Sequence, residues 1–90
     1  MVIHYNLLIR GTVQGVAYRA SAVDIAMRLG ITGYIKNNPE GTVSCEVEGE
    51  EEYLHKFVQW CHHGPGRAKV EHVSITAGDV KGYTSFEMRQ

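Results

Sequence analysis

The spacing of apolar residues constrains the fold of this 90-residue chain more than any other feature of its sequence. Apolar and polar side chains alternate over residues 2–10, which is typical of a strand with one buried face. Over residues 18–29 the apolar side chains recur at intervals of three and four, which is typical of an amphipathic helix. Alternation then returns over residues 42–48, which predicts another strand.

The remaining segments complete the order of elements. A short apolar strand over 33–37 leads into the turn Asn38-Pro39-Glu40-Gly41. A second amphipathic helix begins at residues 50–52, where three glutamates favour the positive end of the helix dipole, and Gly64-Pro65-Gly66 ends it. Further strands are predicted over 70–75 and, more briefly, over 85–89.

The order strand, helix, strand, strand, helix, strand predicts an α+β chain with the ferredoxin-like βαββαβ sandwich topology. Each helix has one apolar face, so both helices are expected to cover one side of an antiparallel sheet. No repeat, linker or low-complexity stretch divides the sequence, and we expect one domain over residues 1–90. Because this topology occurs in enzymes, metal carriers and RNA-binding proteins, the fold alone does not identify the function.

The alternation also predicts which side chains face the helices. The first strand directs Ile3, Tyr5, Leu7 and Ile9 inward, and His4, Asn6, Leu8 and Arg10 outward. On the 42–48 strand Ser44, Glu46 and Glu48 fall on the outer face, where the glutamates are expected to be solvated. The same alternation separates Val70 from Val73. Cys45 and Cys61 lie on apolar faces and are expected to be buried free thiols, with a redox pair or a nucleophile as the alternatives.

Composition excludes several classes of function. Nine basic and ten acidic residues give a net charge of −1, whereas broad binding to a nucleic-acid backbone usually requires a basic surplus. No apolar run approaches the roughly 20 residues that cross a bilayer, and no secretory segment opens the sequence. Two cysteines are too few for a disulfide framework, and the five histidines lack metal-binding spacing. We therefore expect a cytoplasmic protein that binds no nucleic acid, membrane or metal, with a monomer as the default.

The loop between the first strand and the first helix carries the most chemical information. It reads Gly11-Thr12-Val13-Gln14-Gly15-Val16-Ala17-Tyr18-Arg19 and leads into a helix N-terminus, where free N–H groups and the helix dipole attract anions. Two glycines allow the backbone to approach a ligand closely, and Arg19 adds a planar guanidinium suited to phosphate oxygens. By spacing alone, a connecting loop with a solvated arginine is the alternative, since neither glycine-rich nucleotide signature fits.

The run from Gly11 to Arg19 resembles the signature of the acylphosphatase family, usually written G-x-V-Q-G-V-x-F-R. A second family signature follows in order, as Gly33-Tyr34-Ile35-Lys36-Asn37 and then Glu40-Gly41-Thr42-Val43. Shorter matches extend the resemblance over nearly the whole chain, at Leu29-Gly30-Ile31, at Gly64-Pro65 and at Phe86-Glu87-Met88-Arg89.

The resemblance implies metal-free hydrolysis of a small acyl phosphate to a carboxylate and inorganic phosphate, without a cofactor. It places the family's catalytic arginine on Arg19 and its catalytic asparagine on Asn37. The implied phosphate-binding amides fall on Gln14, Gly15, Val16, Ala17 and Tyr18, beside Arg19. Tyr18 stands where the family usually has phenylalanine, and Tyr34 where tryptophan is common. The Tyr18 hydroxyl therefore needs a hydrogen-bond partner.

Two other functions stay open at this point. A non-catalytic domain that keeps the phosphate loop and serves only recognition, as in larger maturation proteins, is the main alternative, although the presence of Asn37 favours the enzyme. A single-stranded RNA binder of the same topology would need exposed aromatic side chains on its central strands and a basic surface. The first strand offers only Tyr5, on the face that the helices are expected to cover.

Overall fold

The computed structural model describes residues 1–90 and contains two helices and five strands. In chain order the elements are β1 (Val2–Thr12), α1 (Tyr18–Leu29), β2 (Thr32–Asn37), β3 (Val43–Glu50), α2 (Glu51–His63), β4 (Lys69–Gly78) and β5 (Phe86–Arg89). The predicted order is confirmed, and α1 has the predicted bounds. No helix of the structure is long and apolar enough to span a membrane.

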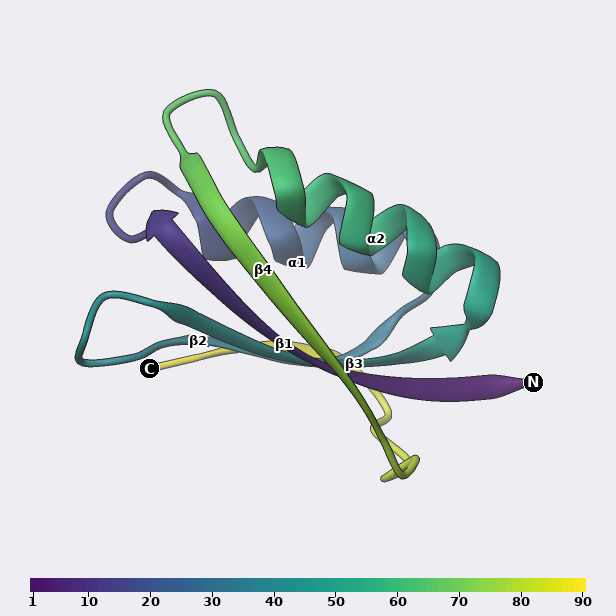
Figure 1. Ribbon diagram of the computed structural model, residues 1–90. Helices are drawn as coiled ribbons and strands as arrows, with labels where there is room; N and C mark the ends of the chain where they lie inside the picture. Colours follow the sequence, from purple (N-terminus) through teal and green to yellow (C-terminus); the bar gives the residue numbers. More distant parts are fainter.

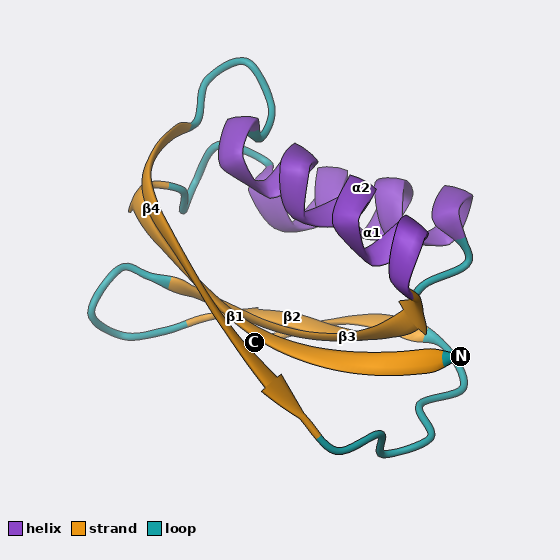
Figure 2. Cartoon of the chain, turned by 45° about the vertical axis from the view of Figure 1, so that its right-hand side comes forward, coloured by secondary structure: helices purple, strands orange, loops and turns teal.

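The five strands form one sheet in the order β4-β1-β3-β2-β5. Both helices pack on the same face of this sheet, as Figures 1 and 2 show, and the opposite face carries only the segment that follows β4. The two-layer ferredoxin-like architecture expected from the sequence is therefore present. The central strands β1 and β3 each lie between two neighbours, and the first ends at the loop that leads into α1.

The expectation of an antiparallel sheet needs one correction. Strands β1 to β4 pair antiparallel, but β5 pairs parallel to β2, so the sheet is mixed. The chain leaves β4 at one edge, crosses the open face of the sheet and reverses its direction before it reaches the other edge. This reversal makes β5 antiparallel to β4 and hence parallel to β2.

The core lies between the helices and the sheet. It consists of buried apolar side chains from both helices and from β1 to β4, with Ile9, Ile35, Val43 and Val47 at its centre. Ala22 and Ala26 are fully buried on α1, where small side chains let the helix lie close to the sheet. Cys45 and Cys61 are both buried and free, as expected. Burial raises the pKa of the Cys61 thiol to about 12, which keeps it protonated and unreactive.

A β-bulge corrects the predicted faces of β4. Arg10 of β1 is paired with His72, but the next residue, Gly11, is paired with Val70, so Glu71 has no partner across the strand pair. The extra residue offsets the alternation of side chains by one position, so residues on either side of the bulge no longer follow one strict alternation. As a result Val70 and Val73 both contact the core, although strict alternation separated them. Gly11 has φ 132° and lies against the β4 backbone so closely that a side chain would not fit.

A third correction concerns the outer face of the sheet. His4 and Glu48 point away from the helices, as predicted, yet both are only 2% exposed rather than solvated. The segment 79–85 between β4 and β5 covers them, because the backbone amides of Lys81, Gly82 and Tyr83 all donate hydrogen bonds to the Glu48 carboxylate. A strand pattern reports which face a side chain occupies, but not whether a distant segment covers that face.

These side chains form a hydrogen-bonded group that we call the His4–Glu48 cluster: His4, Asn6, Tyr34, Glu46, Glu48, Lys81 and Tyr83. His4 contacts Glu48 through Nδ1 at 2.7 Å and Asn6 Oδ1 through Nε2 at 2.9 Å. Glu46 accepts hydrogen bonds from the hydroxyls of Tyr34 and Tyr83 and from Lys81 Nζ, at 2.7–2.8 Å. The cluster therefore fixes the path of the chain from β4 to β5.

Candidate active site

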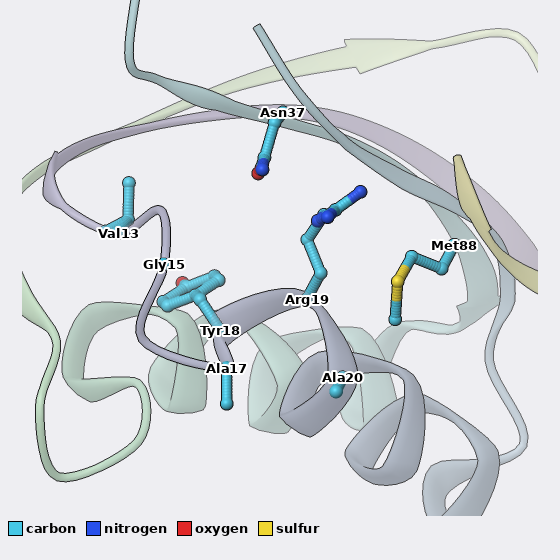
Figure 3. Close-up of a pocket in the computed structure, with 8 residues that line it drawn as sticks. All are labelled: Val13, Gly15, Ala17, Tyr18, Arg19, Ala20, Asn37 and Met88. Carbon is cyan, nitrogen blue, oxygen red and sulfur yellow. The ribbon is translucent and has the colours of Figure 1, made fainter. Parts of the chain in front are cut away.

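A pocket of about 160 Å³ lies where the loop after β1, the start of α1 and the end of β2 meet. It is lined by Val13, Gly15, Ala17, Tyr18, Arg19, Ala20, Asn37 and Met88 (Figure 3). The two side chains singled out in the sequence, Arg19 and Asn37, thus line one pocket, although one comes from a helix and the other from a strand. Figure 3 shows them extending into the same space from the helix side and the sheet side.

The backbone of the loop provides unpaired N–H groups. None of the amides from Gln14 to Ala20 donates a hydrogen bond to another protein group, and the first helical bond of α1 is donated by Ser21 to the Ala17 carbonyl. No side chain caps the helix N-terminus. Seven successive donors and the positive end of the helix dipole therefore remain available to an anion at this end of α1.

Two left-handed residues shape the loop. Gly15 has φ 74°, and Ala17 has φ 62° and ψ 24°, which is uncommon for a residue with a side chain. Such strain is typical of functional loops, where the surrounding structure holds the backbone in place. Nothing lies within 4 Å of the position that a Gly15 side chain would occupy, so the need for glycine at this position is conformational.

Arg19 is held at its pocket position by the last strand. Its Nη1 donates a hydrogen bond of 2.7 Å to the backbone carbonyl of Arg89 in β5. The same strand places Met88 at the pocket wall. The remaining donors of the guanidinium make no hydrogen bond within the protein, so they are free to face an anion. Sequence reasoning did not find this contribution of β5, because the contact spans 70 residues and uses a backbone atom.

Asn37 is the last residue of β2, opposite Val43 of β3. Its Oδ1 is buried and has no hydrogen-bond partner, and no other buried side-chain nitrogen or oxygen of the protein shares this condition. A buried acceptor without a partner is destabilising by roughly 1–3 kcal/mol, so it calls for an explanation. Because this side chain points into the pocket (Figure 3), a ligand there would supply the missing donor.

The turn after Asn37 is locked by its own polar groups. The Asn38 amide donates to the Thr42 carbonyl at 2.8 Å, and Asn38 Nδ2 donates to the hydroxyls of Thr42 and Ser44 at 2.9 and 2.7 Å. Gly41 occupies the positive-φ position of this turn, at φ 101°. The loop contacts the same turn through a side chain, since Gln14 Nε2 donates to the Asn38 and Thr42 carbonyls.

Tyr18 finds the partner that its hydroxyl requires. The ring is 1% exposed, and the hydroxyl donates a 2.7 Å hydrogen bond to the Cys61 carbonyl near the end of α2. The ring also lies 5.2 Å from the ring of Trp60 and fits against Gly64, where a side chain would collide with it. Burial raises the pKa of Tyr18, so the hydroxyl stays neutral and serves as a donor.

Comparison with known proteins agrees with the resemblance in the sequence. The family model named Acylphosphatase matches residues 5–88. An acylphosphatase of Geobacter sulfurreducens is 43% identical over 90 residues, which is 99% of each chain. The crystal structure of an acylphosphatase from Bacillus subtilis superposes with a TM-score of 0.95 at 30% identity, over the full length of both chains.

The same fold also occurs inside a larger protein. Full-length HypF, in a phosphate- and nucleotide-bound form, contains a region that matches this entire chain with a TM-score of 0.93 and 26% identity, but this region is only 12% of HypF. The chain described here belongs to the acylphosphatase family, whose members hydrolyse acyl phosphates.

Proposed function

We propose that this protein hydrolyses the carboxyl–phosphate bond of acyl phosphates in the pocket between the loop and Asn37. One observation carries the proposal: a loop whose amides from Gln14 to Ala20 are unpaired borders one small pocket, which the Arg19 side chain and Asn37, with its unpartnered Oδ1, also line. The amides and Arg19 suit the negative oxygens of a phosphoryl group. Asn37 suits a neutral donor such as water.

The reaction needs few side chains because its leaving group is good. The water oxygen forms a bond to phosphorus, the bond between phosphorus and the acyl oxygen breaks, and the carboxylate leaves with the electron pair. A carboxylate needs no general acid to protonate it. Catalysis therefore consists of positioning and of stabilising the charge on the phosphoryl oxygens, which the loop amides and Arg19 provide.

Asn37 orients the attacking water in this mechanism. A side-chain amide is not a useful base near neutral pH, so its contribution is a hydrogen bond that directs the oxygen toward phosphorus. Its buried Oδ1 accepts from a water hydrogen, and the other proton of that water passes to a phosphate oxygen or to solvent. The position of Asn37 at the end of a paired strand keeps this acceptor fixed.

The proposal also covers the oligomeric state, cofactors, partners and location of the protein. We propose that the domain acts as a monomer on a small-molecule acyl phosphate, without a metal or another cofactor, and without nucleic acid or membrane as a partner. Two buried free thiols are compatible with the reducing conditions of the cytoplasm, where we place the reaction. The pocket reads the phosphoryl group, so several acyl groups fit the proposal equally well.

Hydrolysis of benzoyl phosphate in excess EDTA tests the proposal. The wild type is expected to turn over fully with the chelator present. Asn37→Ala is expected to lower kcat by about 10²-fold, with a smaller effect on inhibition by inorganic phosphate, because the asparagine acts on the water. Activity that depends on a metal, or an Asn37→Ala variant with wild-type kcat, would contradict the mechanism.

A non-catalytic anion-binding module is the second candidate, because the fold also occurs as part of HypF, whose structure is of a phosphate- and nucleotide-bound form. This candidate predicts that inorganic phosphate binds to the folded wild type while no acyl phosphate is hydrolysed. Phosphate titration followed by NMR, beside the same hydrolysis assay, separates the two functions. Loss of phosphate binding in Arg19→Ala is expected under both, so this variant tests the site rather than the activity.

A further inference from the structure

The side chain of Gln14 makes a bridge that a phosphate-binding loop does not itself require. Its Nε2 donates hydrogen bonds to the backbone carbonyls of Asn38 at 2.8 Å and of Thr42 at 2.9 Å. These are the only hydrogen bonds between residues 13–17 and the turn that follows β2. The bridge spans 24 and 28 residues of sequence and links two separate elements.

We infer that Gln14 is a positioning residue that sets the distance between the phosphate-binding loop and Asn37. The inference rests on the proposed function, because it concerns how the two halves of that site are aligned. On one side of the bridge are the amides and Arg19, which hold the phosphoryl group. On the other side is Asn37, which orients the water.

The chemistry of the bridge explains why glutamine serves here. Two carbonyl oxygens 2.8 and 2.9 Å from one nitrogen require two N–H donors on that nitrogen, and a primary amide supplies them. A carboxylate of the same length would present an acceptor to two acceptors. A methionine of similar length would leave both carbonyls without this donor.

The turn is rigid enough to transmit the alignment to Asn37. Asn38 follows Asn37 directly, and its backbone and side chain are both fixed by hydrogen bonds to Thr42 and Ser44. Thr42 Oγ1 in turn donates to Glu40 Oε2 at 2.9 Å. A displacement of the loop relative to this turn would therefore change its position relative to Asn37 as well.

The two ends of the loop are fixed to different parts of the molecule. The hydroxyl of Tyr18 attaches the end of the loop to α2, and Gln14 attaches its beginning to the turn between β2 and β3. Without Gln14 the amides and Arg19 would still face a phosphate, because the Arg89 carbonyl holds Arg19 and the Tyr18 hydroxyl holds the start of α1 independently. Only the position of the Asn37 Oδ1 relative to the phosphate-binding loop would change.

Gln14→Met and Gln14→Glu test the inference, with Gln59→Glu on the exposed side of α2 as the charge-matched control. A displacement of about 1 Å between reacting groups costs about 10²-fold in rate. We expect Gln14→Met to lower kcat for benzoyl phosphate by about 10- to 100-fold, while the inhibition constant of inorganic phosphate changes by less than about threefold. The control is expected to keep wild-type kcat.

The pH profile of Gln14→Glu supplies a readout that a merely structural loss would not produce. At about pH 8 the carboxylate faces two carbonyls, and kcat is expected to lie below that of Gln14→Met. As the pH falls toward about 5, a growing fraction of the glutamic acid is protonated and regains one donor, so its kcat relative to the wild type should rise. Gln14→Met, which has no titrating group, should keep a constant ratio.

The outcomes separate this inference from the proposed function. A wild type that hydrolyses no acyl phosphate overturns both. An active wild type with an equally active Gln14→Met variant overturns only the positioning role. Equal losses of kcat and of phosphate affinity would also overturn it, since they would show that Gln14 supports the loop alone. All rates are compared at temperatures where circular dichroism shows each variant to be folded.

Discussion

Two groups of polar atoms in this small protein, the His4–Glu48 cluster and the candidate active site, differ in their hydrogen bonding. In the His4–Glu48 cluster both carboxylates accept hydrogen bonds on both oxygens, from side chains and from the amides of segment 79–85. At the candidate active site, the seven amides of residues 14–20 and the Asn37 Oδ1 have no protein partner. Both groups are assembled from distant parts of the sequence and both involve charged side chains. Only their hydrogen bonding distinguishes them.

The difference indicates what each group is for. A buried polar network with every atom bonded contributes to stability and to a unique path of the chain. Polar atoms left without partners weaken the fold, and they persist in a native structure where a ligand or a substrate completes them. Substitutions in the cluster should therefore change stability, and substitutions in the pocket should change activity.

The largest effect is expected at Arg19. Arg19→Ala should lower kcat/KM for benzoyl phosphate by about 10³-fold, because it removes the only side-chain cation of the pocket from the developing charge. Its free energy of unfolding should change by less than about 1 kcal/mol, because the side chain makes a single hydrogen bond within the protein. Steady-state kinetics and urea unfolding measure the two quantities.

Arg28→Ala is the matched control for this prediction. Arg28 lies on the same helix, is exposed and pairs only with Asp24 at 3.1 Å. Its removal should leave both quantities nearly unchanged, since exposed ion pairs contribute little. A loss of several kcal/mol in Arg19→Ala would show that the pocket arginine is structural and would remove the contrast between the two groups.

Glu48→Ala should have the opposite effects, a large loss of stability and little change in activity. It leaves the buried His4 ring and three partly buried backbone amides without their acceptor, and about 3 kcal/mol of stability should be lost. At temperatures where the variant is folded, kcat should stay within a few-fold of the wild type. Chemical unfolding followed by fluorescence, together with the hydrolysis assay, provides the check. A stable variant with greatly reduced kcat would reverse the assignment.

The sequence predicted the elements of the fold and its apolar core better than it predicted the two polar groups. Helical and strand periodicity is local, and it predicted both helices, the bounds of α1 and the inward faces of β1 and β3. The resemblance to a known signature also led to Arg19 and Asn37 as candidates. The two lie in one pocket because α1 and β2 pack side by side in this fold.

The remaining features depend on contacts that no local pattern encodes. The burial of Glu48 results from a segment more than 30 residues away, and the face of Val70 results from a bulge that needs the register of a neighbouring strand. The bridge from Gln14 and the carbonyl that holds Arg19 use backbone acceptors, which every residue carries. Sequence letters therefore give no signal for such partners.

Acid should remove the stability that the carboxylates of the cluster contribute to the fold. Burial opposes ionisation of Glu46, but hydrogen bonds from Lys81, Tyr34 and Tyr83 outweigh it and lower the pKa of this carboxyl to about 2. Burial likewise opposes ionisation of Glu48, and the amide and His4 contacts lower its pKa overall. In an unfolded chain both groups would titrate near pH 4.3, as glutamates usually do.

The sign of the pH dependence follows from these directions. A carboxyl whose pKa is lower in the folded state stabilises the fold fully above about pH 5 and loses that contribution as the pH falls toward about 2. We expect a loss of about 2 kcal/mol for Glu46, measured by urea unfolding between pH 7 and pH 2.5. Glu46→Gln should reduce the dependence of the free energy of unfolding on pH, whereas Glu52→Gln, on the exposed face of α2, should not. An equal pH dependence of the unfolding free energy in both variants would contradict the prediction.

Tyr18 sharpens the comparison most, because it lines the pocket but is bonded like a member of the cluster. Its hydroxyl donates to the Cys61 carbonyl, which lacks a helical donor because residue 65, four positions on, is a proline without an N–H. Tyr18→Phe should therefore lower the free energy of unfolding by about 1 kcal/mol, or the Tm by about 4–8 °C. The ring stays in place, so kcat should remain within about twofold of the wild type.

Thermal unfolding and the hydrolysis assay measure these two effects in the same preparation. Tyr34→Phe provides the comparison inside the cluster, where the lost hydroxyl also had a partner, Glu46 Oε2 at 2.7 Å. If hydrogen bonding rather than location decides function, both variants lose stability and neither loses activity. A Tyr18→Phe variant that kept its Tm but lost kcat would show that location in the pocket outweighs a completed hydrogen bond. The rule that hydrogen bonding decides whether a polar group serves stability or activity would then fail for Tyr18.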